Sequence, residues 1–174
     1  RKTTPAARTR YLARIRHAMV DDLEQVVKTV TRATGKADLE ALTGDVYAAL
    51  DMIRYYEKTA PAVLRRQKRK GSPLFRGSRF YVEYEPLGVV AVISPWNYPL
   101  QLAMVPLVSA LAAGNAVILK PSEVTPSVGA LVGDLCREAG LPEGLVQVLQ
   151  GDGRVGTDLI AARPDKVFFT GSVA

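Results

Sequence analysis

The chain has 174 residues, of which 48% are hydrophobic and 23% charged, and this composition is typical of a globular protein with a sizeable core. The net charge of +6 is uneven: residues 1–79 carry 18 Lys/Arg and 8 Asp/Glu, whereas residues 80–174 carry 5 and 9. We therefore expect two different structural units. The single cysteine, Cys136, excludes an internal disulfide and fits a reducing compartment, which predicts a cytoplasmic location.

Two amphipathic helices are predicted first. Apolar residues recur at helical spacing from Tyr11 to Val30 and again from Leu39 to Tyr56, with a break over residues 31–38. His17 lies off the first apolar stripe and is expected to be exposed, so it is assigned neither as a base nor as a metal ligand. We expect no metal site.

The most basic segment is residues 65–70, of sequence RRQKRK, directly before Gly71. Such a run can bind nucleic acid, but no aromatic residue or base-reading motif accompanies it. The solvated end of a helix, where cations suit the helix dipole, is the favoured interpretation. Retention on heparin would test the remaining possibility of a polyanion partner.

From residue 80 onward the pattern changes. Residues 80–85 alternate as in a strand that is exposed on one face. Short apolar runs then alternate with helical segments, which predicts an α/β fold with a parallel sheet and flanking helices. Pro and Gly interruptions argue against a membrane span in the uncharged stretch 86–119. The expected strands are residues 87–94, 116–119, 145–149 and 166–170, and the expected helices are residues 99–113, 125–139 and 154–162.

Residues 93–99, of sequence ISPWNYP, follow the first apolar strand. In an open α/β sheet the ligand crevice lies at the carboxyl ends of the strands. Prolines stiffen such a turn, and the amide of Asn97 offers two donors that could stabilise negative charge on a substrate oxygen in a water-poor cleft. The alternative is a buried asparagine that satisfies loop carbonyls.

Two further motifs lie at strand ends. Lys120 and Glu123, three residues apart, could both hydrogen-bond a ribose diol, or Ser122 and Glu123 could cap the next helix. Residues 151–156, of sequence GDGRVG, spell GxGxxG, but they follow the third strand of the unit rather than the first and lack the downstream acidic residue. Alone, this glycine motif is weak evidence for a nucleotide.

Taken in series, the motifs closely resemble the aldehyde dehydrogenase family. Those that carry the resemblance lie at residues 85–90 (EPLGVV), 93–99 (ISPWNYP), 112–115 (AAGN), 119–123 (LKPSE), 138–142 (EAGLP) and 169–172 (FTGS). The resemblance is strong over residues 85–174, and residues 1–84 are similar to the helices and strand that precede them in that family.

The resemblance implies a nicotinamide cofactor, NAD with NADP possible, bound on a Rossmann-like sheet without the ordinary glycine fingerprint. It implies that Asn97 is catalytic, as an oxyanion donor, and that the cysteine nucleophile and the water-activating glutamate lie beyond residue 174, since neither Cys136 nor Glu138 matches them. The implied cofactor-binding residues are Ile93, Ser94, Pro95, Trp96, Asn97, Lys120, Ser122, Glu123, Gly153, Gly156, Thr157, Phe169, Thr170, Gly171 and Ser172.

The organisation expected from these observations is a helical part over residues 1–70, the start of an oligomerisation β arm over 71–86, and an NAD-binding domain over 87–174 that lacks its last crossover. The chain is thus expected to be an inactive fragment of a longer enzyme, a homodimer or homotetramer, that oxidises an aldehyde substrate to an acid and needs neither nucleic acid nor membrane. The alternatives are a related acyl-phosphate reductase and a non-catalytic dinucleotide-binding or assembly module.

Overall fold

The computed structural model describes residues 3–171. Its centre is a parallel four-stranded sheet of order β5-β4-β3-β6, made of β3 (Val89–Ile93), β4 (Ala116–Lys120), β5 (Val146–Val148) and β6 (Lys166–Phe169). The crossovers are α5 (Pro99–Ala113), α6 (Pro126–Glu138) and α7 (Gly153–Ala161). The predicted Rossmann-like α/β sheet is confirmed, with strand and helix ends shifted by one or two residues.

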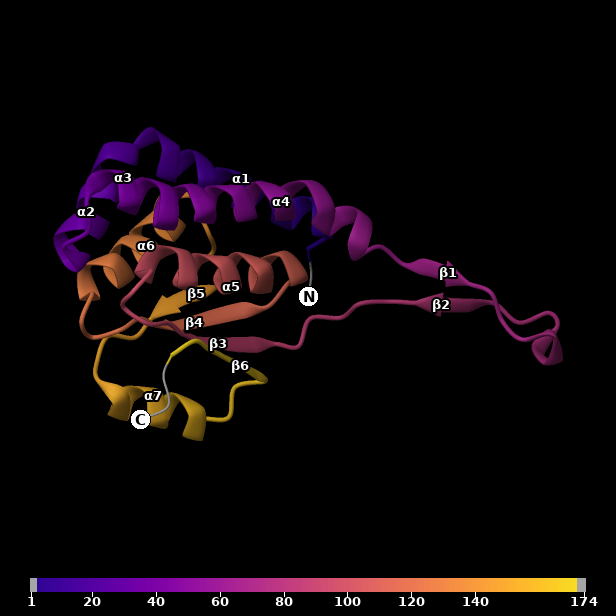
Figure 1. Ribbon diagram of the computed structural model, residues 1–174. Coiled ribbons are helices and arrows are strands. Elements are labelled where there is room, and N and C mark those ends of the chain that lie inside the picture. The colour runs from indigo at the N-terminus through magenta and orange to yellow at the C-terminus, as the bar shows by residue number, and fades with distance from the viewer. Residues whose placement is uncertain (1–2, 172–174) are drawn as a thin grey trace.

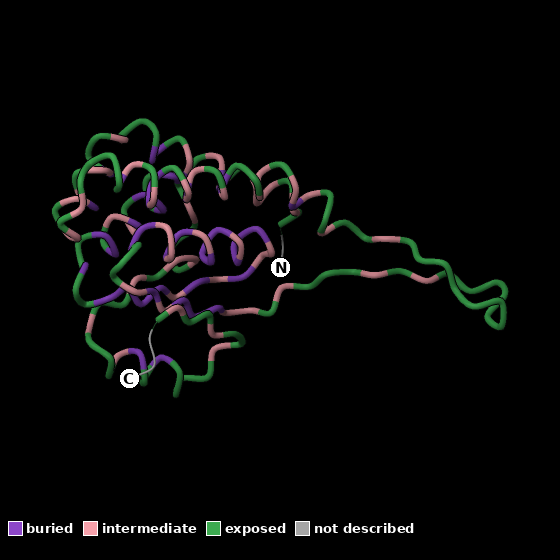
Figure 2. Tube along the Cα trace, in the orientation of Figure 1, coloured by how far each residue is buried: buried purple, intermediate pink, exposed green. Residues whose placement is uncertain are grey.

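Helix α5 is buried because almost its whole surface is apolar. It lies on the same side of the sheet as α6, and the N-terminal helices form a further layer over it, whereas α7 covers the opposite face (Figure 1). Gly114, at φ +95, ends α5 in a left-handed conformation that a side chain would strain. The buried residues follow these layers and form one cluster that includes Leu12, Ile53, Met104, Leu107 and Val132 (Figure 2).

The first predicted helix is two helices. Helix α1 (Pro5–Asp21) is capped by Thr4 and ends at Asp22, from which α2 (Leu23–Thr34) begins. Aspartate favours helix ends because its short side chain competes for backbone groups, and periodicity alone does not reveal this break. His17 is exposed, as expected.

The second predicted helix contains a π-helical segment. It consists of α3 (Asp38–Glu40), the π-helix η1 (Ala41–Tyr47) and α4 (Ala48–Val63). The wider π turn changes the phase of the apolar stripe, so Leu39, predicted to be buried, is exposed, whereas Val46 and Ile53 are buried. An ion pair of 2.7 Å between Arg16 and Glu57 joins α1 to α4.

The interpretation of residues 65–70 as a helix end is wrong. Helix α4 ends at Val63, and the basic run enters β1 (Gln67–Arg69), which pairs antiparallel with β2 (Phe80–Val82). The two strands and the 3-10 turn η2 (Pro73–Phe75) form a hairpin that projects from the body (Figure 1). Local charge did not predict this pairing, because the partner strand lies beyond a glycine-rich and proline-containing turn.

Candidate functional site

The carboxyl ends of three neighbouring strands lie together at one edge of the sheet. Ile93, the last residue of β3, is in register with Lys120 of β4 and with Phe169 of β6. The ladders continue one residue further: Ser94 N–H donates to the Lys120 carbonyl at 3.1 Å, and Thr170 N–H donates to the Ile93 carbonyl at 3.0 Å. The segments that follow β3, β4 and β6 are thereby held side by side.

A cavity of about 380 Å³ lies at this edge, within the size range of small-molecule and cofactor sites. Most of the residues predicted to bind the cofactor line this cavity. They come from the segments that follow β3, β4 and β6 and from the first turns of α7. They are Ile93, Ser94, Pro95, Trp96, Lys120, Ser122, Glu123, Gly153, Gly156, Thr157, Phe169, Thr170 and Gly171, joined by Ile160. Ser172 lies outside the described residues.

Asn97 lines a second, adjacent cavity of about 370 Å³, together with Leu102. The two cavities share Pro95, Trp96, Thr170 and Gly171, so they meet at the turn after β3. Asn97 therefore lies beside the predicted cofactor residues but not among those that line the first cavity.

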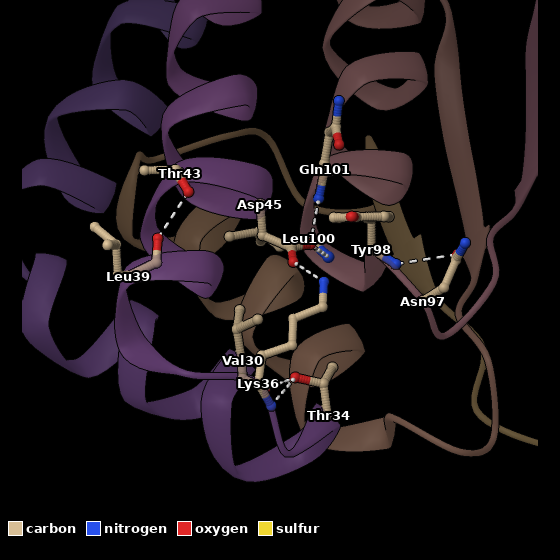
Figure 3. Close-up of polar contacts among 10 residues, drawn as sticks. All are labelled: Val30, Thr34, Lys36, Leu39, Thr43, Asp45, Asn97, Tyr98, Leu100 and Gln101. Atoms are coloured by element: carbon tan, nitrogen blue, oxygen red, sulfur yellow. Dashed lines mark hydrogen bonds and ion pairs between the residues drawn. The ribbon is translucent and has the colours of Figure 1, made fainter.

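The environment of Asn97 differs from both sequence interpretations. Its side chain is exposed in this chain, so it is neither in a water-poor cleft nor buried against loop carbonyls. Its Oδ1 accepts a hydrogen bond of 3.0 Å from Tyr98 N–H (Figure 3). Because the amide oxygen is engaged, the Nδ2 donors are the part of the side chain left to bind a substrate oxygen.

Lys120 and Glu123 form an ion pair. Lys120 Nζ lies 2.9 Å from Glu123 Oε2, with the lysine buried and the carboxylate 52% exposed. The hydrogen bond from Lys120 is the main cause that lowers the pKa of Glu123, so the carboxylate is ionised at neutral pH. The capping alternative is wrong, because α6 has Thr125 as its N-cap residue and no side-chain hydrogen bond caps it. Ser122 Oγ accepts from Val124 N–H at 3.2 Å, before the helix begins, and Glu123 is directed to Lys120.

Ser94 contributes a polar atom without a partner in the described part of the chain. Its Oγ is buried, and no atom of residues 3–171 hydrogen-bonds to it. A buried hydroxyl without a partner is costly, and a polar ligand in the adjoining cavity would relieve that cost.

The glycine motif begins α7. Gly153 is the first residue of the helix, and Asp152 Oδ1 accepts from Arg154 N–H at 2.9 Å as its cap. A Cβ at Gly153 would meet no atom within 4 Å, so the helix start is open towards the cavity that this residue lines. The motif therefore contributes to the same site from the side of α7.

Sequence reasoning missed four residues at or behind this site. Ile160 lies one helical turn after Gly156, so helical periodicity could have indicated it. Leu102 is on the first turn of α5. Lys36 and Asp45 come from the distant helical layer, and no local signal marks them.

Cys136 is excluded as a nucleophile. It is buried on α6, and burial raises its thiol pKa to about 12. A reactive cysteine needs an accessible thiolate near neutral pH. Within residues 3–171 there is also no group of three or more His, Cys, Asp or Glu side chains that could hold a metal ion, and none of the helices there is long and apolar enough to cross a bilayer.

Comparison with known proteins gives one consistent result. Residues 1–174 match the Aldehyde dehydrogenase family. A 4,4'-diapolycopene aldehyde oxidase of Methylomonas sp is 48% identical over 167 residues, which is 95% of this chain and 32% of that protein.

Solved structures show the same likeness. The substrate-bound state of Staphylococcus aureus AldH superposes with a TM-score of 0.89 at 30% identity, over 95% of this chain and 36% of that one. A NAD-dependent aldehyde dehydrogenase from Sinorhizobium meliloti gives a TM-score of 0.87 at 31% identity, over 98% and 34%. The chain spans about a third of the length of these relatives.

Proposed function

Because this chain belongs to the aldehyde dehydrogenase family, we propose that it supplies the cofactor-binding part of an enzyme that oxidises an aldehyde to a carboxylic acid with NAD. The observation that carries the proposal is the cavity at the sheet edge, where the ends of β3, β4 and β6 and the start of α7 converge. The Sinorhizobium relative, named as NAD-dependent, supports the choice of cofactor.

The residues around the cavity suit a dinucleotide. In the proposed complex, Lys120 and Glu123 bind the hydroxyls of the adenosine ribose, and Ser94 Oγ gains the hydrogen-bond partner that it lacks within the described chain. Gly153 and Gly156 allow close approach of the adenine side, and residues 169–171 line the path towards Asn97.

Glu123 favours NAD over NADP. Its carboxylate is charged at neutral pH because Lys120 lowers its pKa, and it would repel the additional phosphate on the ribose of NADP. Lys120 is already paired with Glu123, which reduces its capacity to offset that repulsion.

Asn97 is proposed to bind the aldehyde oxygen through Nδ2. Charge builds on that oxygen when a nucleophile attacks the carbonyl, and a positioned amide donor stabilises it by about 2.7–4 kcal/mol. When bound, NAD would supply the hydride acceptor that oxidation of the aldehyde needs. The attacking cysteine and the water-activating glutamate are proposed to lie outside residues 1–174, since Cys136 is buried.

We propose an apolar aldehyde as the substrate class. Trp96 and Leu102 line the cavity beside Asn97, and their side chains would contact a hydrocarbon chain attached to the aldehyde group. The name of the Methylomonas relative, a diapolycopene aldehyde oxidase, supports this class.

The β1–β2 hairpin is proposed to pair with a second subunit in a homodimer or homotetramer. It projects from the body (Figure 1). Leu74 and Phe75, in the turn between its strands, are exposed. Exposed strand edges and apolar tips of this kind favour association with another chain.

The test is a titration of the complete polypeptide that carries this chain with NAD and with NADP, by calorimetry. We expect Glu123→Gln to raise the Kd for NAD on the order of 10-fold, because a charge-assisted hydrogen bond is lost. The preference for NAD over NADP should become smaller, because the charge that repels the additional phosphate is removed. Glu143→Gln, at an exposed glutamate on the loop before β5, is the matched control and should leave both constants unchanged. An unaltered Kd for NAD in Glu123→Gln would contradict the assigned role.

A further inference from the structure

Asp45 is a fully buried carboxylate that binds the start of a helix distant in sequence. It lies on the π-helix η1 with 0% exposure. Its Oδ1 accepts from Leu100 N–H at 3.1 Å and from Gln101 N–H at 3.3 Å (Figure 3). These are early N–H groups of α5, whose own N-cap residue, Tyr98, makes no capping hydrogen bond through its side chain. Asp45 therefore caps α5 from another layer of the fold.

Lys36 balances the buried charge. Its Nζ lies 2.8 Å from Asp45 Oδ2, and its side chain is only 12% exposed. The same ammonium lies 3.6 Å from the centre of the Tyr98 ring, within range of a cation–π interaction. One cation thus contacts both the capping carboxylate and the residue that follows Asn97.

Gly44 makes room for this arrangement. A Cβ built there would come within 2.9 Å of Tyr98 Cε1, so the Tyr98 ring packs directly against the backbone of η1. The π-helix presents adjacent residues for two contacts: Gly44 to the Tyr98 ring and Asp45 to the α5 amides. Single π turns inside helices frequently occur at functional sites.

The network ends at Asn97. Tyr98 N–H donates to Asn97 Oδ1. The residue whose ring Lys36 and Gly44 hold therefore also orients the Asn97 amide, through its backbone N–H. The N-terminal layer thus contacts this segment at the Tyr98 ring and at the amides of Leu100 and Gln101, all directly after Asn97. Small displacements of a group that binds a reacting atom can cost about 100-fold in rate.

We infer that Asp45, with Lys36, is a positioning residue for Asn97: it holds the turn after β3 so that Nδ2 faces the substrate oxygen. This inference rests on the proposed role of Asn97 as an oxyanion donor. Asp45 touches neither of the two cavities, so it acts through the start of α5 and Tyr98.

A double-mutant cycle in the complete polypeptide tests the coupling. Asp45→Asn keeps the size and one oxygen acceptor but removes the charge and turns an amide donor towards Lys36. The measured quantity is kcat for aldehyde oxidation at saturating NAD, in Asp45→Asn, Asn97→Ala and the double variant. We expect losses of about 10-fold for Asp45→Asn and about 100- to 1,000-fold for Asn97→Ala, and no additional loss in the double variant.

The outcomes separate the two proposals. No loss in Asn97→Ala contradicts the proposed function itself. A second outcome is that Asn97→Ala lowers kcat and that Asp45→Asn lowers kcat by the same factor in the unmodified protein and in Asn97→Ala. This outcome overturns the positioning role, because Asp45 then acts independently of Asn97. The positioning role is also overturned if Asp45→Asn changes only the KM for NAD or changes nothing.

A second pair of variants covers the case in which Asp45→Asn does not fold. Lys36→Met should lower kcat with an unchanged KM for NAD, whereas Lys36→Arg, which keeps the cation near Asp45 and Tyr98, should restore most of the loss. Equal activity of Lys36→Met and Lys36→Arg would contradict the inference. Glu24→Gln, which removes an exposed ion pair with Lys28 on α2, is the control and should match the unmodified protein.

Discussion

Lys120 Nζ lies 2.9 Å from Glu123 Oε2, across the turn by which the chain leaves β4. The lysine is buried while the carboxylate is half exposed, so the ammonium is held by the protein and Glu123 remains accessible to a ligand. Burial leaves Lys120 few other partners, and the pair therefore orients the carboxylate at the cavity that both residues line.

The titration of Glu123 should depend on Lys120. The hydrogen bond from Lys120 is the largest cause of the lowered pKa, followed by a backbone hydrogen bond and the charge of Lys120. A carboxyl group whose pKa is lowered in the folded state stabilises the fold at pH values above its ordinary pKa of about 4.3. This stabilisation is lost as the pH falls through the folded-state pKa. Because the carboxylate is half exposed, we expect the ion pair to stabilise the fold by less than about 1 kcal/mol.

NMR titration of the Glu123 side-chain carboxyl carbon checks this prediction. In Lys120→Met the pKa of Glu123 should rise towards its ordinary value, and in Asp134→Asn, which removes an exposed ion pair with Arg137, it should not move. An unchanged pKa in Lys120→Met would show that the pair does not form in solution.

Removal of the Asp45 side chain should destabilise the whole fold. Asp45→Ala leaves the Lys36 ammonium buried without its partner and two N–H groups of α5 without an acceptor. Breaking a buried pair in this way costs about 3–5 kcal/mol. Urea unfolding monitored by circular dichroism measures the loss, with Glu24→Gln as the control for an exposed pair. A loss close to that of the control would mean that the network contributes little to stability.

Truncation of a side chain at the centre of the core should destabilise the fold by a similar amount. Leu107 is fully buried on α5, between the sheet and the N-terminal helices. Leu107→Ala is expected to lower the free energy of unfolding by about 2–5 kcal/mol through lost burial and a residual cavity. Leu39→Ala, at a residue of α3 that is 71% exposed, should change it by no more than about 0.5 kcal/mol. Equal effects of the two variants would contradict the assigned burial.

Cys136 should be unreactive in the native protein. Burial raises its thiol pKa to about 12, so thiolate is scarce at pH 8 and reagents cannot reach the sulfur. In the isolated chain, we expect no reaction with a chromogenic disulfide reagent before unfolding and one equivalent of reaction in concentrated urea. Rapid modification of the folded chain would refute this, and Cys136→Ser, which has no thiol, provides the baseline.

Much of the sheet could be predicted because its local signals agree. The apolar residues of β3 and β4 and the proline and glycine at the two ends of α5 mark those elements without reference to partners. The parallel pairing then brings Ile93 and Lys120 into register, as the position of both motifs at strand ends predicted. The meeting of these two strand ends therefore follows from the sheet pattern, whereas the individual lining residues after β3 were implied by the family resemblance.

Other features are not indicated by hydrophobic periodicity or local charge. The basic run at residues 65–70 forms a strand only because residues 80–82 return beside it, and the break at Asp22 and the π turn at residues 41–47 interrupt a continuous apolar stripe. In each case the competing interaction is a long-range pairing or a local backbone preference, to which hydrophobic periodicity is insensitive.

The sequence by itself determined the family resemblance, the parallel sheet and the residues at the strand ends, because short-range pattern and composition specify these. Only the tertiary structure decided how Asn97 is held: Asp45 and Lys36 reach the start of α5 from a separate helical layer. The Asp45 carboxylate and the α5 amides are far apart in sequence, and they become neighbours only when the helical layer packs on the sheet. How this buried charge is balanced therefore depends on tertiary packing.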